Sequence, residues 1–409
     1  MKATLSNIAE NGSFAPIFSP LMRGDQARVV SDYFEGLRDA SPRATSHPIV
    51  EADTSWDIRE ATVLRVRYTD QLFTVKVGAN YAYPIERELR AHPTYTRPLS
   101  AIGRAPQLLC SNKSAHVAIM THLSGELVEG TPREWDPGIY REAGRLLRIF
   151  HNTESRIDKG YEHALRLRTL NRLTEIPPGA SPLPRDIEQA ARFYLENFTP
   201  QPTKIVPTHG DYQPRNWLWD KASHHGKQGV YTETHPENCE TPPHPETRET
   251  PAHQSKGYQS EALQSEGCQS KAHRNEGCLK IIDFGRFGWR PPSTDFARLA
   301  AGQFISHPEL EAAFVEGYGG DPRTTSVVEQ KIGESQNAHN NKTANSAQNV
   351  LATPEHAVES WWIGRLADGL GTFWYATTRG YNEEFAEIGI QMCYTALKYM
   401  EELGIGRYS

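Results

Sequence analysis

The sequence predicts an α+β fold of two packed lobes or domains, with strand signals in the first part of the chain and helix signals in both parts. Three observations support this prediction. The chain has 409 residues, which is more than a single hydrophobic core usually organises. Residues 62–77 alternate and are rich in β-branched side chains, as strands are. Apolar residues recur every three or four positions at 139–150 and 383–403, which is typical of amphipathic helices.

The first part of the chain is expected to hold an extension followed by alternating strand and helix signals. Residues 1–45 are mixed and turn-rich. The segments with a regular pattern are, in order, a helix at 24–38, a hairpin at 62–77, a helix at 85–92 and a strand at 117–123. The hairpin has Thr69-Asp70 at its centre, and the strand VAIMTHL runs into a turn at Ser124-Gly125.

Two polar stretches interrupt this pattern, at residues 221–277 and 322–353. Both are poor in aliphatic residues and cannot bury enough apolar surface to offset the entropy of ordering, so we expect them to be disordered or loosely held. Within the first, residues 254–278 repeat a five-residue unit with at most one apolar residue, which argues against a stacked repeat fold. Its His and Cys residues form no CxxC or HxxxH pair, so a plain linker is preferred over a metal site.

The composition argues against several function classes. The 44 Lys and Arg residues are outnumbered by 50 Asp and Glu residues, for a formal net charge of -6, so no overall basic field attracts nucleic acid. The sequence has no secretory apolar segment after Met1 and no apolar run of about 18 residues. Five scattered cysteines favour a cytoplasmic protein with free thiols. We expect a cytoplasmic monomer or weak dimer that binds neither nucleic acid nor membranes.

Two segments that flank the first polar stretch carry the candidate chemistry. PTHGDYQPRNWLWD ends in the strand-like run 217–219, and CLKIIDFGRFGW begins with the strand-like run 279–282. We therefore expect an antiparallel hairpin whose turn has been expanded by residues 221–277. Lengthening such a loop lowers the stability of the protein only slightly, because each doubling of the loop length costs only about 0.6 kcal/mol in closure entropy.

The polar residues of these segments suit phosphoryl transfer to a hydroxyl. Asp211 lies in a loop that Gly210 and Pro214 would bend sharply, an exposed setting for a carboxylate that accepts a hydroxyl proton. Asn216 offers an amide oxygen, and Asp283 offers a carboxylate at the end of the next strand. Oxygen ligands on adjacent loops suit Mg²⁺. Singly, Asp211 or Asn216 is better explained as the cap of a turn, whereas the combination favours catalysis.

The same segments resemble a known family. HGDYQPRN resembles the H-G-D-x-x-x-x-N catalytic loop of the aminoglycoside phosphotransferase family, which has a protein-kinase-like fold and includes choline and small-sugar kinases. IIDFGRFGW resembles its metal-binding I-D-F-G segment, and STDFARLA its D-x-A-x-L stretch. The resemblance runs from about residue 60 to the C-terminus, apart from the polar stretches. It implies a bilobal kinase-like fold, with an extension at 1–45, a β-rich N-lobe at 46–122 and a mainly helical C-lobe at 123–409.

The resemblance also implies roles for individual residues. Asp211 would be the catalytic base, and Asn216 and Asp283 would be the Mg²⁺ ligands. Asp295 would anchor the catalytic loop rather than bind metal, and His209 would be a packed, hydrogen-bonded support for that loop. Whether the Arg that follows D-F-G contacts phosphate or solvent is left open.

Further upstream, the resemblance implies a nucleotide site. Lys76 in FTVKV would orient the ATP phosphates and pair with a helix carboxylate, with Glu88 preferred to Glu86. The alternative is an edge-strand Lys that points at water. Backbone groups from Met120 to Leu123 would face adenine, unless this run is a plain core strand.

One departure from the family pattern concerns the phosphate loop. No G-x-G-x-x-G precedes Lys76, so the loop over the phosphates would come from the glycine-free DTSWD at 53–57. The resemblance implies ATP as the nucleotide, and because the loop lacks the family's glycines, GTP is not excluded. GYGGDP at 317–322 does not replace this loop, because it follows a helical run and is expected to be a C-cap.

The sequence thus predicts Mg²⁺-dependent transfer of the ATP γ-phosphate to a hydroxyl of a small molecule, in the manner of an aminoglycoside phosphotransferase. Carboxylates that would suit a polycationic acceptor are Asp368, Glu383, Glu384 and Glu387. Aromatic residues that would either stack on a sugar or macrolide or pack in the core are Trp361, Trp362, Phe373, Trp374 and Tyr375. The alternatives are a sugar, amino-alcohol or macrolide kinase, or a catalytically silent nucleotide-binding protein. Gly210 and the lack of an A-P-E segment disfavour a protein kinase.

Overall fold

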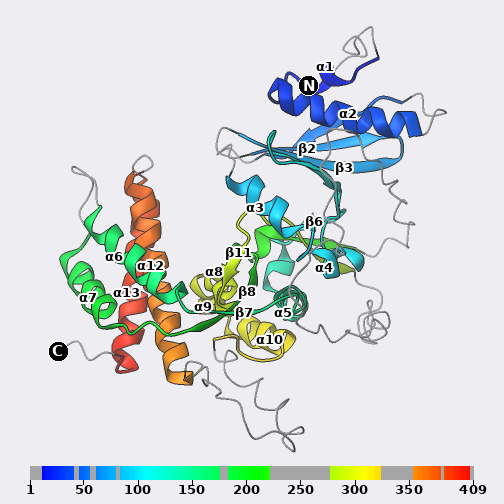
Figure 1. Ribbon diagram of the computed structural model, residues 1–409. Helices are drawn as coiled ribbons and strands as arrows, with labels where there is room; N and C mark the ends of the chain where they lie inside the picture. Colours follow the sequence, from blue (N-terminus) through cyan, green and yellow to red (C-terminus); the bar gives the residue numbers. More distant parts are fainter. Residues whose placement is uncertain are drawn as a thin grey trace, which may run out of the picture. The chain divides into compact units, whose positions relative to one another are not determined.

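The computed structural model describes residues 12–40, 46–55, 61–79, 83–175, 183–221, 277–323, 353–378 and 382–405. They form two compact units: the first comes from Met1–Ile139 and His209–Gly288, and the second from Tyr140–Thr208 and Trp289–Ser409. The first unit is built on sheets and the second is mainly helical, which confirms the predicted α+β class (Figure 1). Most of both polar stretches lies outside the described residues, so their predicted disorder stays a prediction, as do the lobe boundaries.

A five-stranded antiparallel sheet is the framework of the first unit, in the order β1-β2-β3-β5-β4. Its strands are β1 (Ile49–Asp53), β2 (Ala61–Tyr68), β3 (Gln71–Gly78), β4 (Leu108–Asn112) and β5 (Val117–Thr121). Strands β2 and β3 form the predicted hairpin, with Thr69 at a positive φ of 54° in the turn. The predicted strand at 117–123 corresponds to β5.

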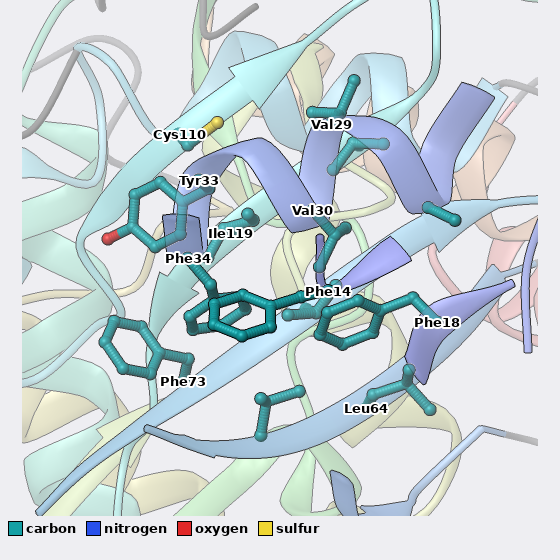
Figure 2. Packing of buried hydrophobic residues seen from close by; sticks show 14 of the residues in the cluster. Phe14, Phe18, Val29, Val30, Tyr33, Phe34, Leu64, Phe73, Cys110 and Ile119 are labelled. Carbon is teal, nitrogen blue, oxygen red and sulfur yellow. The ribbon is translucent and has the colours of Figure 1, made fainter. Parts of the chain in front are cut away.

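Helices α1 (Ala15–Phe18) and α2 (Gly24–Ala40) cover one face of this sheet. The predicted helix at 24–38 is therefore confirmed, and it belongs to the core of the unit. Figure 2 shows the aromatic centre of this packing, where the rings of Tyr33 and Phe34 lie 6.0 Å and 5.3 Å from that of Phe73. Phe73, Val75 and Val77 all belong to this cluster. Since side chains alternate along a strand, residues 74 and 76 face the other side of the sheet.

Helix α3 (Tyr83–Ala91) lies on that other side, where Ile85 and Leu89 pack with Leu108, Ala118 and Met120. It confirms the helix predicted at 85–92. Strand β5 is buried along its whole length because alternate residues contribute to the two clusters. The alternation places Lys76 of β3 on the face that carries α3, and this sets up the candidate active site.

The remaining elements of the first unit surround the predicted catalytic loop. They are α4 (Arg97–Ala101), β6 (Glu126–Leu127), η2 (Pro132–Trp135), η3 (Pro214–Asn216), β9 (Trp217–Asp220) and β10 (Cys278–Ile281). Strands β9 and β10 pair antiparallel, with Asp220 opposite Cys278 and Trp217 opposite Ile281. The hairpin predicted around the first polar stretch is confirmed.

The second unit consists mainly of helices. Its elements are most of α5 (Pro137–His151), β7 (Arg156–Asp158), α6 (Tyr161–Thr174), α7 (Arg185–Asn197), β8 (Thr203–Thr208), β11 (Gly288–Arg290), η5 (Pro292–Phe296), α8 (Ala297–Ala301), α9 (Gln303–Ser306), α10 (Pro308–Tyr318), α12 (Pro354–Thr378) and α13 (Glu383–Glu402). Helix α5 buries the predicted stripe, which includes Ala143, Leu146 and Leu147. Helix α10 ends at the predicted C-cap, where Gly319 has a φ of 83°.

Helix α13 confirms the helix predicted at 383–403, but most of the predicted apolar stripe, which is Phe385, Ile388, Met392, Ala396, Tyr399 and Leu403, is not its buried face. Its buried residues are Ala386, Gly389, Cys393, Ala396 and Met400, whereas Phe385, Ile388, Tyr399 and Leu403 are exposed. The reason is close packing against α12, beside which it lies in Figure 1. A Cβ on Gly389 would come within 2.6 Å of the backbone nitrogen of Phe373. Small residues therefore line this contact although the larger apolar ones are more hydrophobic.

Two other expectations concern the cysteines and membranes. Among the described cysteines, Cys278 and Cys393 have free thiols, as predicted. Cys110 is disulfide-bonded instead, so the prediction is wrong for that residue, because spacing along the chain does not show which sulfur atoms approach in space. Within the described part of the chain, we find no helix with both the length and the apolar character required to span a bilayer.

Candidate active site

The first unit brings Lys76, Glu88 and Asp283 together, although they come from a strand, a helix and a distant loop. Lys76 Nζ donates to Glu88 Oε2 at 2.5 Å and to Asp283 Oδ1 at 2.7 Å. Lys76 is 8% exposed and Glu88 is 1% exposed. The Lys therefore does not point at water from an edge strand. Its carboxylate partner is Glu88, while Glu86 lies 3.8 Å from His116.

The charges of this group stabilise one another. Burial alone would lower the pKa of Lys76, but the carboxylates of Asp283 and Glu88 outweigh it and raise that pKa. Burial likewise opposes ionisation of Asp283, but the Lys76 ammonium outweighs it and lowers the pKa of Asp283 to about 2. The pKa of Glu88 is lowered against burial for the same reason. All three groups are thus charged at neutral pH.

His92 lies beside Glu88, and Phe284 packs against His92. His92, one helical turn further along the chain, has Nε2 3.6 Å from Glu88 Oε1, and its ring contacts Phe284 edge-on at 5.4 Å. Thr96 Oγ1 lies 3.2 Å from His92 Nδ1. Helix α3 therefore positions Glu88. The contact between His92 and Phe284 also joins this helix to the segment that contains Asp283.

Asp283 directly follows strand β10 and has a positive φ of 65°. This left-handed conformation is uncommon outside glycine, and Asp tolerates it better than most residues. The backbone N–H of Gly285 also donates to the Asp283 carboxylate. A Cβ on Gly285 would come within 3.2 Å of Asp283 Oδ1, so a larger residue there would have to displace this carboxylate by a few tenths of an ångström.

The predicted catalytic loop is attached to the same segment by hydrogen bonds. His209 is fully buried, its Nδ1 accepts from the backbone N–H of Asp211 at 3.3 Å, and its Nε2 donates to the carbonyl of Ile282 at 3.0 Å. The backbone N–H of Ile282 donates to the carbonyl of Asn216 at 3.0 Å. The structure agrees with His209 as a packed support. Because Ile282 directly precedes Asp283, these bonds attach the catalytic loop to the segment that carries Asp283.

Asp211 is buried, with 4% exposure, and not exposed as the bent loop suggests. Its neighbours in the loop cover it. Gln213 Nε2 donates to Oδ1 at 2.6 Å, and Arg215 Nη2 donates to Oδ2 at 2.7 Å. Asn216 Nδ2 donates to Oδ2 at 3.2 Å and to the Asp211 carbonyl at 2.8 Å. Arg286 Nε lies 3.9 Å from Oδ2.

Asn216 and Asp283 offer a chemistry that fits Mg²⁺. The Asn216 amide nitrogen is used on Asp211, which leaves its carbonyl oxygen as the candidate ligand. The Asp283 carboxylate is ionised and its side chain is 38% exposed, so a cation can reach it. Among the described residues, no group of three or more His, Cys, Asp and Glu side chains could hold a metal ion. Mg²⁺ does not need such a group, because it keeps several waters and uses one or two carboxylates.

The two predicted adenine contacts lie in different settings. Met120 is within β5, its side chain packs in the core, and it pairs with Thr74 and Leu108. This matches the alternative of a plain core strand. Leu123 follows the strand and is 7% exposed, and the last backbone N–H bonded to the sheet is that of His122, which donates to the Leu72 carbonyl at 3.2 Å. The contact of Met120 and Leu123 with adenine stays a prediction.

The predicted phosphate loop is described only in part. Its first residues continue from β1, where Asp53 Oδ1 accepts from the Ser55 N–H at 3.0 Å and Ser55 Oγ accepts from the Val63 N–H at 2.9 Å. These side chains bend the backbone without glycine. Residues 56–60 lie outside the described residues.

The other candidates belong to the second unit. Asp295 is fully buried and accepts from His151 Nε2 at 3.0 Å, while His151 Nδ1 lies 2.9 Å from the Tyr318 hydroxyl. The Asp295 carboxylate therefore takes part in the internal packing of the second unit. Of the aromatic candidates, Trp361 and Phe373 are buried and Tyr375 is 47% exposed.

Of the residues that contact Asp211, sequence analysis identified Asn216 as a site residue but not Gln213 or Arg215. Gln213 and Arg215 lie inside the quoted HGDYQPRN motif, but the family pattern leaves both positions open. The available signal is that Asp211 and Arg215 carry opposite charges and lie only four residues apart in one tight loop. Arg286 comes next to the I-D-F-G segment, and its contact requires the hydrogen bonds between the two segments.

Comparison with known families gives one match. The family model described as the phosphotransferase enzyme family matches residues 75–230. The matched segment includes Lys76, Glu88, Asp211 and Asn216, and it ends before Asp283. Among curated proteins, none matches the chain.

Several solved structures are similar at low identity. The macrolide 2′-phosphotransferase MphH from Brachybacterium faecium is 14% identical with a TM-score of 0.42, over 88% of this chain and 97% of that one. A putative aminoglycoside phosphotransferase from Ralstonia eutropha JMP134 is 13% identical with a TM-score of 0.47, over 90% and 98%. A GDP complex of an aminoglycoside 2′-phosphotransferase-IIIa mutant is 9% identical with a TM-score of 0.48, over 92% and 99%. At these values the likenesses carry no conclusion about activity or ligands. The match at residues 75–230 confirms that the chain resembles the aminoglycoside phosphotransferase family, as its catalytic-loop motif predicts.

Proposed function

We propose that the protein is a Mg²⁺-dependent phosphotransferase that moves the γ-phosphoryl group of ATP to a hydroxyl of a small molecule, with GTP as the alternative donor. The observation that carries this proposal is that Lys76 Nζ donates hydrogen bonds to Glu88 at 2.5 Å and to Asp283 at 2.7 Å. The backbone hydrogen bond between Asn216 and Ile282 joins the catalytic loop to the same group. The family match to residues 75–230 supports phosphotransferase chemistry.

Each residue has one task in this mechanism. Lys76, held by Glu88, contacts the nucleotide phosphates. Asn216 and Asp283 would hold Mg²⁺, which would supply positive charge to the phosphates. Asp211 accepts the proton of the acceptor hydroxyl. The acceptor oxygen forms a bond to the γ-phosphorus, the bond from that phosphorus to the β–γ bridging oxygen breaks, and the nucleoside diphosphate leaves.

The acceptor class is tested by a transfer screen. Purified protein with ATP or GTP is offered aminoglycosides, macrolides, hexoses, amino alcohols, hydroxy acids and sugar acids, with Mg²⁺ or with EDTA, and phosphorylated product is measured. We expect product from at least one class, only with Mg²⁺. An absence of product with every acceptor and both nucleotides would contradict the proposal.

A catalytically silent nucleotide-binding protein is the second candidate. It is favoured by the engaged state of Asp211, whose two oxygens accept from Gln213 and Arg215 at 2.6 Å and 2.7 Å. A carboxylate has about four lone-pair sites, however, so a hydroxyl can still donate to it. Nucleotide binding by calorimetry, without any transfer in the screen, would identify this alternative.

A further inference from the structure

Two positive charges lie beside the proposed base. Arg215 Nη2 donates to Asp211 Oδ2 at 2.7 Å, and Arg286 Nε is 3.9 Å from the same oxygen. The Asp211 side chain is 6% exposed, whereas those of Arg215 and Arg286 are 33% and 52% exposed. A molecule that approaches Asp211 from solvent therefore meets guanidinium groups at this carboxylate.

The proposed nucleotide site already has its own positive charge. Lys76 is available to the phosphates between Glu88 and Asp283, and Mg²⁺ would bind at Asp283 and Asn216. Arg215, by contrast, contacts the group that is proposed to receive the acceptor proton. The positive charge of the guanidinium groups is thus placed at the acceptor rather than at the nucleotide.

We propose that Arg215 and Arg286 select an acceptor that carries an anionic group, such as a hydroxy acid or a sugar acid, and disfavour polycationic acceptors. This inference rests on the proposed function and narrows its acceptor class. A planar guanidinium group binds a carboxylate through two parallel hydrogen bonds. A cationic acceptor beside these guanidinium groups is repelled. Such charge complementarity changes the selectivity between acceptors more than the affinity for the preferred one.

A matched acceptor series tests the inference. Glycerate, glycerol and 3-amino-1,2-propanediol share one CH(OH)CH₂OH group and differ in charge. Among sugars, glucuronate, glucose and glucosamine share a pyranose ring with hydroxyls at C3 and C4 and differ in charge. We expect kcat/KM for the anionic member to exceed that for the cationic member by about tenfold or more. Arg215→Gln should bring this ratio close to one, Arg215→Lys should keep most of it, and Arg286→Gln should lower it less. Arg192→Gln is the matched control, because Arg192 is 38% exposed and pairs with Glu188 at 3.2 Å in the second unit.

The outcomes separate the inference from the proposed function. Equal kcat/KM values across the charges, or a ratio that Arg215→Gln leaves unchanged, would overturn the inference. A loss in Arg215→Gln that is the same for every acceptor, with a raised KM for nucleotide, would assign Arg215 to the transferred phosphoryl group and also overturn it. Calorimetry of the same series with protein loaded with ADP and Mg²⁺ covers the case without transfer. If no transfer occurs, the proposed function fails. In that case, binding of the anionic member that depends on Arg215 still supports the inference, and a lack of such binding contradicts the inference.

Discussion

Lys76→Met should destabilise the protein strongly, because it removes the ammonium that Glu88 and Asp283 share. Glu88 is 1% exposed and lies 2.5 Å from Lys76 Nζ, so the substitution leaves a carboxylate buried without its cation. Removing one partner of a buried ion pair costs about 3–5 kcal/mol. We expect a loss of that size in the free energy of unfolding at pH 7, together with loss of nucleotide binding.

The loss should depend on pH in a defined direction. In the wild type, burial would raise the pKa of Glu88, but Lys76 outweighs it and holds that pKa low. Without Lys76, burial dominates and the pKa rises above its ordinary value of about 4.3. A carboxyl group with a raised folded-state pKa loses stability as pH rises above its unfolded-state pKa. The defect of Lys76→Met should therefore be largest at pH 7 and shrink as the pH falls to about 4.

Urea denaturation of three variants measures this effect. Lys76→Met is compared with Lys76→Met/Glu88→Gln, in which the stranded carboxylate is neutralised and most of the stability should return. Lys398→Met is the control, because Lys398 is 70% exposed and its nitrogen lies 3.8 Å from Glu402. We expect the control to stay within about 0.5 kcal/mol of the wild type. The reasoning is refuted if Lys76→Met resembles the control, or if the double variant is no more stable than the single one.

Three further predictions concern the metal, the polar insertion and a buried histidine. Asp283→Ala should weaken nucleotide binding by calorimetry more with Mg²⁺ than without it, and an equal loss would indicate a folding role instead. Replacing residues 221–277 with Asn-Gly should preserve folding and transfer in reducing buffer, where neither protein has the Cys110 disulfide, because Asp220 and Cys278 already form the end of the ladder; a folded but inactive product would show that the insertion contributes to function. Burial would lower the pKa of His356, but Glu162, 2.8 Å away, and Glu359 outweigh it and raise that pKa to about 9. The protonated His356 should contribute about 3 kcal/mol to the free energy of unfolding below about pH 6.5, and the wild type should lose this contribution as the pH rises through 9. His356→Gln should not show this loss when denaturation is measured as a function of pH.

Local patterns of the sequence were sufficient to predict the framework of the site. Alternation in FTVKV separates Phe73, Val75 and Val77 from Lys76, and the structure uses the two faces of β3 in that way. The strands that flank the first polar stretch could be predicted from their side chains, and the ladder between Asp220 and Cys278 confirms them. These predictions succeed because period and turn chemistry are local properties.

The features that could not be predicted depend on contacts between distant segments. The buried face of α13 is decided by the close approach of α12, where Gly389 has no room for a Cβ, so hydrophobicity alone selects the wrong stripe. The burial of Asp211 depends on Gln213 and Arg215 folding back over it, and on Arg286 from another segment. Neither the small-residue contact nor the charge around the base follows from the pattern of a single segment.

The most direct test of the proposed catalytic role is a single-turnover comparison of wild type and Asp211→Asn with the acceptor found in the screen. Nucleotide affinity is measured in parallel, and Asp220→Asn is the control, since Asp220 follows in the next strand and pairs with Lys280 at 2.7 Å. We predict that Asp211→Asn slows transfer by about 10²–10⁴-fold, the usual contribution of a positioned general base, with nearly unchanged nucleotide affinity. Transfer within a few-fold of wild type would contradict the assignment of Asp211 as the base.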